Sequence, residues 1–201
     1  MDLLLATHNL GKIREYRTLL KSFAHFDIYS LVDYPAYQAP DESGATFAEN
    51  AEIKALAAAE YFPDKIIIAD DSGLVVPALQ NEPGVLSARY AGASARDIDN
   101  RKKLIQRLKT LSEEDRLGHF ECAICMAKGD RVLKKAAGIC EGFLLIQEKG
   151  NNGFGYDSLF VKHGYNKTFA ELGASVKNEV SHRRKALQKV AAFLEDTSFS
   201  A

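Results

Sequence analysis

Short apolar runs alternate with amphipathic stretches in the first third of this chain. Residues 3–6 and 66–69 are wholly apolar, and such short runs predict strands that are buried on both faces. Apolar side chains recur at helical spacing over residues 13–20, and an alanine-rich helix is predicted over residues 46–62. Residues 28–31 predict one further strand between these helices. The order strand, helix, strand, helix, strand is typical of an α/β protein.

The rest of the chain adds a hairpin to this pattern. Apolar residues flank Lys128-Gly129-Asp130, which predicts two antiparallel strands over residues 120–127 and 131–139. A hairpin beside strand–helix units indicates a mixed sheet. Further strands are expected over residues 74–79, 142–146 and 159–161, and amphipathic helices over residues 98–111 and 187–194.

Composition and charge narrow the class of protein. The 201 residues are 46% hydrophobic and 26% charged, with a formal net charge of −1. This balance is ordinary for a globular protein and gives no electrostatic case for binding nucleic acid or a membrane surface. The first residues lack a basic segment followed by a long apolar one, so we expect no signal peptide, and no apolar run is long enough to span a bilayer. We therefore expect a cytoplasmic protein with no nucleic-acid or membrane partner.

The three cysteines do not change this picture. An odd number of thiols without a secretion signal indicates free cysteines. Cys122 and Cys125 form a C-x-x-C pattern within a predicted strand, where residues three apart point to opposite faces. We interpret them as small buried hydrophobic side chains rather than as ligands of a shared metal.

The first candidate for chemistry is the pair Asp70-Asp71, which directly follows the apolar run at residues 66–69. Ligands gather at strand ends in α/β sheets, where two carboxylates can bind a hard cation or accept a proton. Ser72 and Gly73 then supply turn chemistry. Taken alone, this stretch is also compatible with a solvated turn.

The segment from Thr7 to Lys12 joins a predicted strand to a helix N-terminus. The free N–H groups and the dipole of such a terminus favour an anion, and Lys12 adds a positive charge for phosphate. The glycine spacing of a Walker motif is absent. An ordinary capped connection explains the segment equally well.

An acidic loop at residues 41–44 precedes the second helix. Thr46 and Glu49 match a capping box, so Glu49 has a structural explanation. Glu42 has none, which makes it the better candidate for a second metal carboxylate. Lys54 either points towards Asp71 or is solvated.

Two later segments supply glycine, aromatic and basic groups. Gly153 and Gly155 bracket Phe154 in a loop where backbone can approach a ligand and aromatic rings can stack on a base, although a glycine-rich hairpin end is the alternative. His182 and Arg183 follow Ser181, a plausible N-cap, in the first turn of the final helix. Cations there oppose the helix dipole, which favours a polar ligand nearby over simple solvation. We expect the cluster at residues 101–103 to be the solvated face of its helix.

Six motifs, in order along nearly the whole chain, resemble the inosine triphosphate pyrophosphatase family, also called Ham1-like. They are Thr7-x-Asn9-x-x-Lys12, Glu42-x-Gly44-x-Thr46-Phe47-x-Glu49-Asn50, Ala69-Asp70-Asp71-Ser72-Gly73-Leu74, Pro83-Gly84-x-x-Ser87-Ala88-Arg89-Tyr90, Gly153-Phe154-Gly155-Tyr156-Asp157 and Ser181-His182-Arg183. Each motif alone is only moderately specific, and the set of six is much more so.

The resemblance implies an α/β fold of two lobes around a long central mixed β-sheet flanked by helices, with residues 1–201 forming a single domain. It implies that a nucleotide binds in the cleft between the lobes and that the protein is a homodimer. It also implies Mg²⁺-dependent hydrolysis of non-standard purine nucleoside triphosphates (ITP, dITP and XTP) to the monophosphate and pyrophosphate, which cleanses the nucleotide pool.

The resemblance also assigns roles by motif position. Asp71 would be the proton acceptor and a metal ligand, and Glu42 the second metal ligand. The expected nucleotide contacts are Thr7, His8, Asn9, Leu10, Gly11, Lys12, Ser72, Phe154, Gly155, Tyr156, Asp157, Lys177, His182 and Arg183. Two positions depart from the family pattern, because His8 stands where glycine is frequent and Ser158 where proline usually follows. His8 bears on how closely the backbone approaches phosphate, and Ser158 on the stiffness of its loop.

The residue types fit this chemistry independently. Triphosphate hydrolysis needs a hard cation, a base for water and cationic donors for the developing charge. Asp70, Asp71 and Glu42 are oxygen ligands suited to Mg²⁺, and Lys12, Lys177 and Arg183 are cations. A pyrophosphatase of different base preference and a non-enzymatic nucleotide sensor are the rival hypotheses. The intact acids argue against a sensor, which needs no base.

Overall fold

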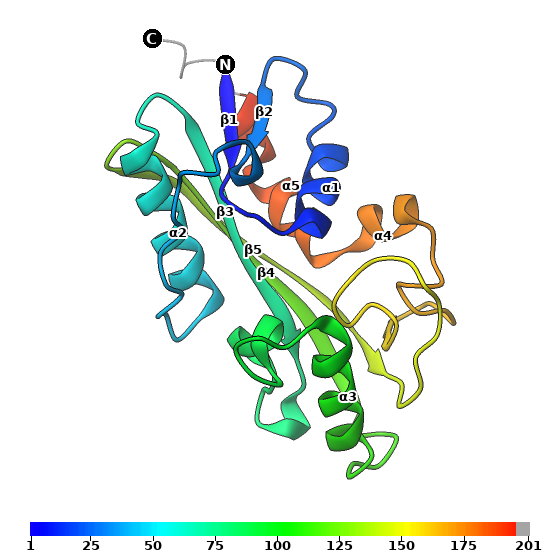
Figure 1. Cartoon of the computed structure of the whole chain (residues 1–201). Helices are drawn as coiled ribbons and strands as arrows, with labels where there is room; N and C mark the ends of the chain where they lie inside the picture. Colours follow the sequence, from blue (N-terminus) through cyan, green and yellow to red (C-terminus); the bar gives the residue numbers. More distant parts are fainter. Residues whose placement is uncertain (196–201) are drawn as a thin grey trace. The chain divides into compact units, whose positions relative to one another are not determined.

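The computed structural model describes residues 1–195 of the chain, and Figure 1 shows its elements in order. The strands are β1 (Asp2–Leu5), β2 (Asp27–Ser30), β3 (Ile66–Val75), β4 (Leu117–Lys128), β5 (Arg131–Leu144) and β6 (Phe160–Lys162). The α-helices are α1 (Leu10–Leu19), α2 (Phe47–Tyr61), α3 (Asp97–Leu108), α4 (Ala174–Val180) and α5 (His182–Glu195). Three 3₁₀ segments are η1 (Leu31–Asp33), η2 (Pro77–Leu79) and η3 (Gly84–Arg89).

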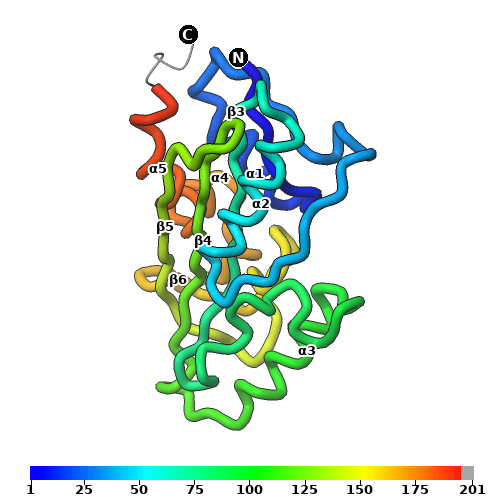
Figure 2. Tube along the Cα trace, turned by 90° about the vertical axis from the view of Figure 1, so that its left-hand side faces the viewer, coloured from blue at the N-terminus to red at the C-terminus, as the bar shows by residue number. Residues whose placement is uncertain are grey.

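The six strands form one sheet in the order β2-β1-β3-β4-β5-β6. β1 pairs in parallel with β2 and with β3, whereas β5 and β6 are antiparallel. The hairpin strands β4 and β5 lie side by side (Figure 2) and are joined at Gly129, whose φ of 58° suits the tight turn. The prediction of a mixed sheet flanked by helices is therefore confirmed.

The strand β3 differs from its prediction because it does not turn at Asp70-Asp71-Ser72-Gly73 but runs through all four residues. β3 lies between β1 and β4 in the sheet, and at its end the Ser87 hydroxyl accepts a hydrogen bond from the Leu74 amide at 2.9 Å and donates to the Gly84 carbonyl at 2.6 Å. A Cβ on Gly73 would lie 2.2 Å from Ser87 Oγ, so this glycine permits close approach rather than a turn. The strand expected over residues 74–79 is likewise wrong beyond Val75, because Pro77 begins the 3₁₀ segment η2.

The chain divides into two compact units, which we describe separately. Unit 1 comprises residues 1–71, 122–138 and 183–195 of the described chain, and unit 2 comprises residues 72–121 and 139–182. In unit 1, α1 and α5 bury apolar side chains against one face of β1, β3 and β4, and α2 lies on the other side of β1 and β3 (Figure 1). The sheet of unit 1 is thus covered by helices on both faces, which is why β1 and the start of β3 are continuous apolar runs.

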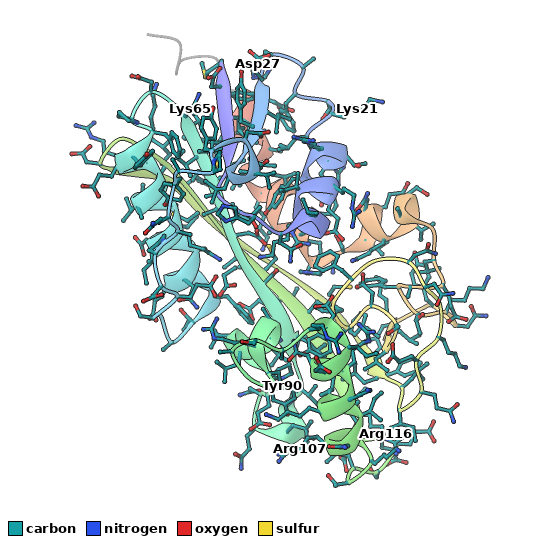
Figure 3. The ribbon with its side chains drawn as sticks, viewed as in Figure 1. Lys21, Asp27, Lys65, Tyr90, Arg107 and Arg116 are labelled. Atoms are coloured by element: carbon teal, nitrogen blue, oxygen red, sulfur yellow. The ribbon has the colours of Figure 1, made fainter. Side chains whose placement is uncertain are left out.

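Unit 2 has its own apolar core, built from the end of β3, from α3, from parts of β4 and β5 and from residues 156–180. Arg116 closes the C-terminal end of α3 by donating to the carbonyls of Leu108 at 3.2 Å and Leu111 at 3.1 Å (Figure 3). Such a cation satisfies carbonyls that have no partner within the helix. The expectation that residues 101–103 form a solvated face of this helix is wrong for Arg101, because only 18% of its side chain is exposed.

Two local predictions are confirmed. Thr46 Oγ1 accepts from the Glu49 amide at 3.1 Å while Glu49 Oε2 accepts from the Thr46 amide at 3.3 Å, so the capping box starts α2. All three cysteines are free thiols and buried.

Among the helices of residues 1–195, none is long and apolar enough to cross a membrane.

Candidate active site

The carboxylate of Asp71 lies near the middle of β3 and faces two residues of α2. Asn50 Nδ2 donates to Asp71 Oδ2 at 3.1 Å, and Lys54 Nζ lies 3.7 Å from Asp71 Oδ1. Asn50 and Lys54 are four residues apart and therefore share one helix face. Lys54 also donates to Glu42 Oε1 at 2.7 Å, so Lys54 points towards Asp71 and is not simply solvated. The hydrogen bond from Asn50 to Asp71 was not predicted from the sequence, although the four-residue spacing of Asn50 and Lys54 indicates that both side chains lie on one helix face.

The surroundings of the Asp71 carboxylate disfavour its charged form relative to water. Burial raises the pKa of Asp71, and the nearby charge of Glu42 raises it further, whereas Lys54, Lys12 and the Asn50 amide lower it. The net effect is a pKa above the ordinary value. A carboxylate with a raised pKa is a stronger base, which suits a group that accepts a proton from water.

Asp70 is in the opposite electrostatic situation. Its carboxylate is buried, and Oδ2 lies 3.0 Å from Lys12 Nζ and 3.1 Å from Arg183 Nη2. Burial alone would raise the pKa of Asp70, but Lys12 and Arg183 hold it well below the usual range. Asp70 is therefore a weak base whose charge is already balanced by two cations, and the adjacent acids have different chemical properties.

Glu15 is a further member of this cluster that the sequence did not reveal. It forms a short, buried ion pair with Arg183 Nη1, so the guanidinium bridges Glu15 and Asp70. A signal was present, because Glu15 lies three residues after Lys12 and four before Leu19, on the buried side of α1. A carboxylate at such a position needs a cationic partner.

The segment from Thr7 to Lys12 reaches α1 through ordinary capping. Asn9 is the N-cap, with Oδ1 accepting from the Lys12 amide at 3.0 Å, and Thr7 Oγ1 accepts from the Asn9 amide at 3.1 Å. His8 and Leu10 are exposed, while Gly11 is buried. The capped connection and the phosphate role of Lys12 are compatible, because the cap uses the Lys12 amide and leaves its ammonium beside Asp70.

The predicted metal ligands Asp71 and Glu42 share one cation, the Lys54 ammonium. Within residues 1–195, no group of three or more His, Cys, Asp and Glu side chains is placed to hold a metal ion. Two carboxylates nevertheless fit Mg²⁺, which is held in enzymes by one or two carboxylates, by waters and by the phosphates of the substrate. The donor set of Asp71 and Glu42 is therefore suited to a metal that arrives with a phosphorylated ligand.

In unit 2, Asp157 organises the glycine-containing loop. Its Oδ2 accepts from the Phe154 amide at 3.0 Å and from Lys177 Nζ at 2.5 Å. Gly153 has a φ of 77°, and a Cβ there would lie 2.0 Å from Asp157 Oδ2, so this position favours glycine on both counts. Lys177 Nζ lies 4.7 Å from the centre of the Phe154 ring, in a cation–π contact. The structure thus brings three predicted nucleotide contacts together.

Two further predicted contacts of unit 2 are more enclosed. The Tyr156 hydroxyl donates to the Ser87 carbonyl at 2.9 Å, and the ring is buried. The His182 ring, also buried, stacks on Phe120 with centroids 4.9 Å apart. Ser72 is half-buried in β3. The roles of all predicted site residues in nucleotide binding stay predictions.

Asp71 and Glu42 place two carboxylates around the Lys54 ammonium beside the central strand of an α/β sheet, a donor set of the kind that a metal-assisted hydrolase uses. Comparison with known proteins then gives the family: residues 3–193 match the Ham1 family, and the chain belongs to it.

The chain is similar to proteins of known name over almost its full length. It is 50% identical over 197 residues to a dITP/XTP pyrophosphatase of Protochlamydia amoebophila, covering 98% of each chain. Its fold matches the solved Ham1 protein of Staphylococcus aureus with a TM-score of 0.84 at 38% identity, covering 97% of this chain and 98% of the other. A HAM1 protein from Coxiella burnetii gives a TM-score of 0.86 at 34% identity, with 98% and 100% covered. These matches confirm the predicted family and fold class.

Proposed function

We propose that this protein hydrolyses non-standard purine nucleoside triphosphates (ITP, dITP and XTP) to the monophosphate and pyrophosphate, with Mg²⁺ as its metal. Membership of the Ham1 family and the 50% identity to a dITP/XTP pyrophosphatase support this activity. The observation that carries the proposal is the geometry at Asp71, whose carboxylate shares the Lys54 ammonium with Glu42 and so lies beside a second carboxylate suited to a metal. We further propose that the protein is a cytoplasmic homodimer and that residues 1–201 act as a single domain.

Four residues of the cluster in unit 1 have roles in this reaction. Asp71 accepts a proton from the attacking water, whose oxygen forms a bond to the α-phosphorus while the bond to the bridging oxygen of pyrophosphate breaks. Asp71 and Glu42 would hold Mg²⁺, which when bound neutralises charge on the phosphate oxygens. Asn50 orients the Asp71 carboxylate through its 3.1 Å hydrogen bond, and Lys12 offers its ammonium to phosphate.

We assign base recognition to Phe154, Tyr156 and His182, all of which belong to unit 2. Hypoxanthine and xanthine carry an oxygen at C6 and a proton on N1, whereas adenine carries an amino group at C6 and a bare N1. Donors that meet O6 would therefore face an N–H of adenine, and each unpaired buried group costs about 1–3 kcal/mol. Two mismatches approach the roughly 10⁴-fold rejection that hydrogen-bonding sites achieve. Guanine keeps O6, and its rejection must come from its 2-amino group.

The test is release of pyrophosphate from ITP, XTP, dITP, GTP and ATP, each with Mg²⁺ and again with excess chelator. We expect efficient release from the first three with Mg²⁺ and none with chelator. Equal kcat/KM for ITP and ATP would leave only a general nucleotide pyrophosphatase. Binding of nucleotide without any pyrophosphate release would favour the sensor instead.

A further inference from the structure

Two side chains of helix α3 hold the glycine-containing loop of unit 2. They bind the backbone N–H and the backbone C=O of the same loop residue, Gly155. Asp97 Oδ2 accepts from the Gly155 amide at 2.7 Å, and Arg101 Nη1 donates to the Gly155 carbonyl at 3.0 Å. Asp97 and Arg101 are four residues apart and share one face of α3. Gly155 has a φ of 60°, a left-handed conformation that favours glycine.

Arg101 is itself fixed by a second contact. Its Nε donates to Glu148 Oε2 at 2.7 Å, and the same oxygen accepts from Ser158 Oγ at 2.9 Å. Glu148 and Ser158 flank the loop on its two sides in the sequence. The planar guanidinium therefore joins Gly155 to Glu148, which in turn binds Ser158, a geometry that a single ammonium cannot reproduce.

Phe154 is more exposed than the two residues that follow Gly155 in this loop, so its ring can contact a ligand. Its neighbours Tyr156 and Asp157 are buried and hydrogen-bonded, whereas the Phe154 ring is half-buried. The amide of Phe154 is held by Asp157, and the next residue, Gly155, is held by α3. The backbone is thus fixed on both sides of a ring that carries the Lys177 ammonium on its face.

We infer that Asp97 and Arg101 are positioning residues that fix Phe154 for binding of the substrate base. The inference rests on the proposed function, because it gives Phe154 the base as its ligand. Neither residue contacts the base. Their effect is to order the loop before substrate arrives, so that binding energy is not used for ordering.

The kinetic consequence is a change in KM rather than in kcat. If Arg101→Ala leaves the loop correctly ordered only one time in ten, the apparent affinity for ITP falls about tenfold. The acids of unit 1 are unchanged, so kcat should stay within about twofold of wild type. Arg101→Lys restores the charge without the planar fork and should recover only part of the affinity.

The ordering itself can be measured without substrate, because the chain contains no tryptophan. Phe154→Trp introduces a single fluorophore at the loop, and its acrylamide quenching and anisotropy report its exposure and mobility. We expect Arg101→Ala to raise quenching and lower anisotropy in this background. Lys102→Ala, on the exposed side of the same helix turn, is the matched control and should change neither.

A second pair of variants, at Asp97, distinguishes loss of loop ordering from misfolding of the whole protein. Asp97→Asn keeps an oxygen that can accept from the Gly155 amide, whereas Asp97→Ala does not. We expect a KM for ITP close to wild type in the first and raised in the second, with Tm measured for both. Only variants whose Tm stays near wild type are compared.

The outcomes separate this inference from the proposed function. Unchanged fluorescence in Arg101→Ala would show that α3 does not order the loop and would overturn the inference. Changed fluorescence with an unchanged KM would show that the loop does not position a substrate contact, which also overturns it, although pyrophosphate release would still stand. Absence of pyrophosphate release by the wild-type chain would instead reject the proposed function.

Discussion

Exchanging each of the two adjacent aspartates for asparagine should separate catalysis from stability. Both substitutions keep the size of the side chain and remove its charge. Asp71→Asn removes the base and one metal carboxylate, and loss of a general base lowers kcat by roughly 10²- to 10⁴-fold. Asp70→Asn removes the carboxylate that balances Lys12 and Arg183.

The expected changes in stability follow from the two environments. Asp71 has a raised pKa, which means that the fold disfavours its charged form at neutral pH, so a neutral asparagine should leave the free energy of unfolding unchanged or higher. The Asp70 side chain is 1% exposed, and its loss leaves the buried Arg183 and the half-buried Lys12 without the carboxylate that they share. Breaking such a pair costs about 3–5 kcal/mol, or roughly 6–20 °C in Tm for a chain of this size.

The assay is pyrophosphate release from ITP at saturating Mg²⁺, alongside thermal unfolding followed by circular dichroism. We expect an inactive Asp71→Asn protein with a Tm at or above wild type, and an Asp70→Asn protein with a clearly lowered Tm. An Asp71→Asn protein that keeps more than about a tenth of wild-type kcat would refute the assignment of the base. Equal losses of Tm in both variants would refute the electrostatic reasoning.

Three further predictions use other parts of the structure. Lys12→Ala and Lys177→Ala should each lower kcat/KM for all triphosphates alike, because phosphate contacts carry no base information; a changed ITP-to-ATP preference in Lys177→Ala would move that residue to base recognition. Measured side by side with Mg²⁺, kcat/KM for ITP should lie far above that for ATP and above that for GTP, and similar values for ITP and ATP would contradict the base assignment. Gly73→Ala should destabilise the protein by about 1–3 kcal/mol in urea unfolding, because its Cβ would lie 2.2 Å from Ser87 Oγ, and the additional variant Ser87→Gly should relieve part of this loss.

Elements with local signals could be predicted from the amino-acid sequence alone. Hydrophobic periodicity predicted β1, α1 and the β4–β5 hairpin, and the T-x-x-E spacing predicted the capping box of α2, because the residues that decide these features lie within a few positions of one another. Matching of whole motifs identified the family and marked Asp71 and Glu42 as candidates. The turn expected after Asp71 was wrong because the partners of this stretch lie far along the chain: β3 continues beside β4 in the sheet, and the Leu74 amide donates to Ser87, 13 residues away.

The differences between the candidate groups depend on contacts that form only in the folded chain. Asp70 and Asp71 are identical in sequence terms, and they are distinguished by partners that lie far along the chain: Lys12 is 58 residues from Asp70, and Arg183 is 113 residues from it. In the same way, Arg101 looked like part of a solvated face until its contacts with Glu148 and Gly155 were known. The physical reason is that a charge acquires its pKa and its role from burial and from opposite charges within a few ångströms, and folding brings these together from segments that the sequence keeps apart.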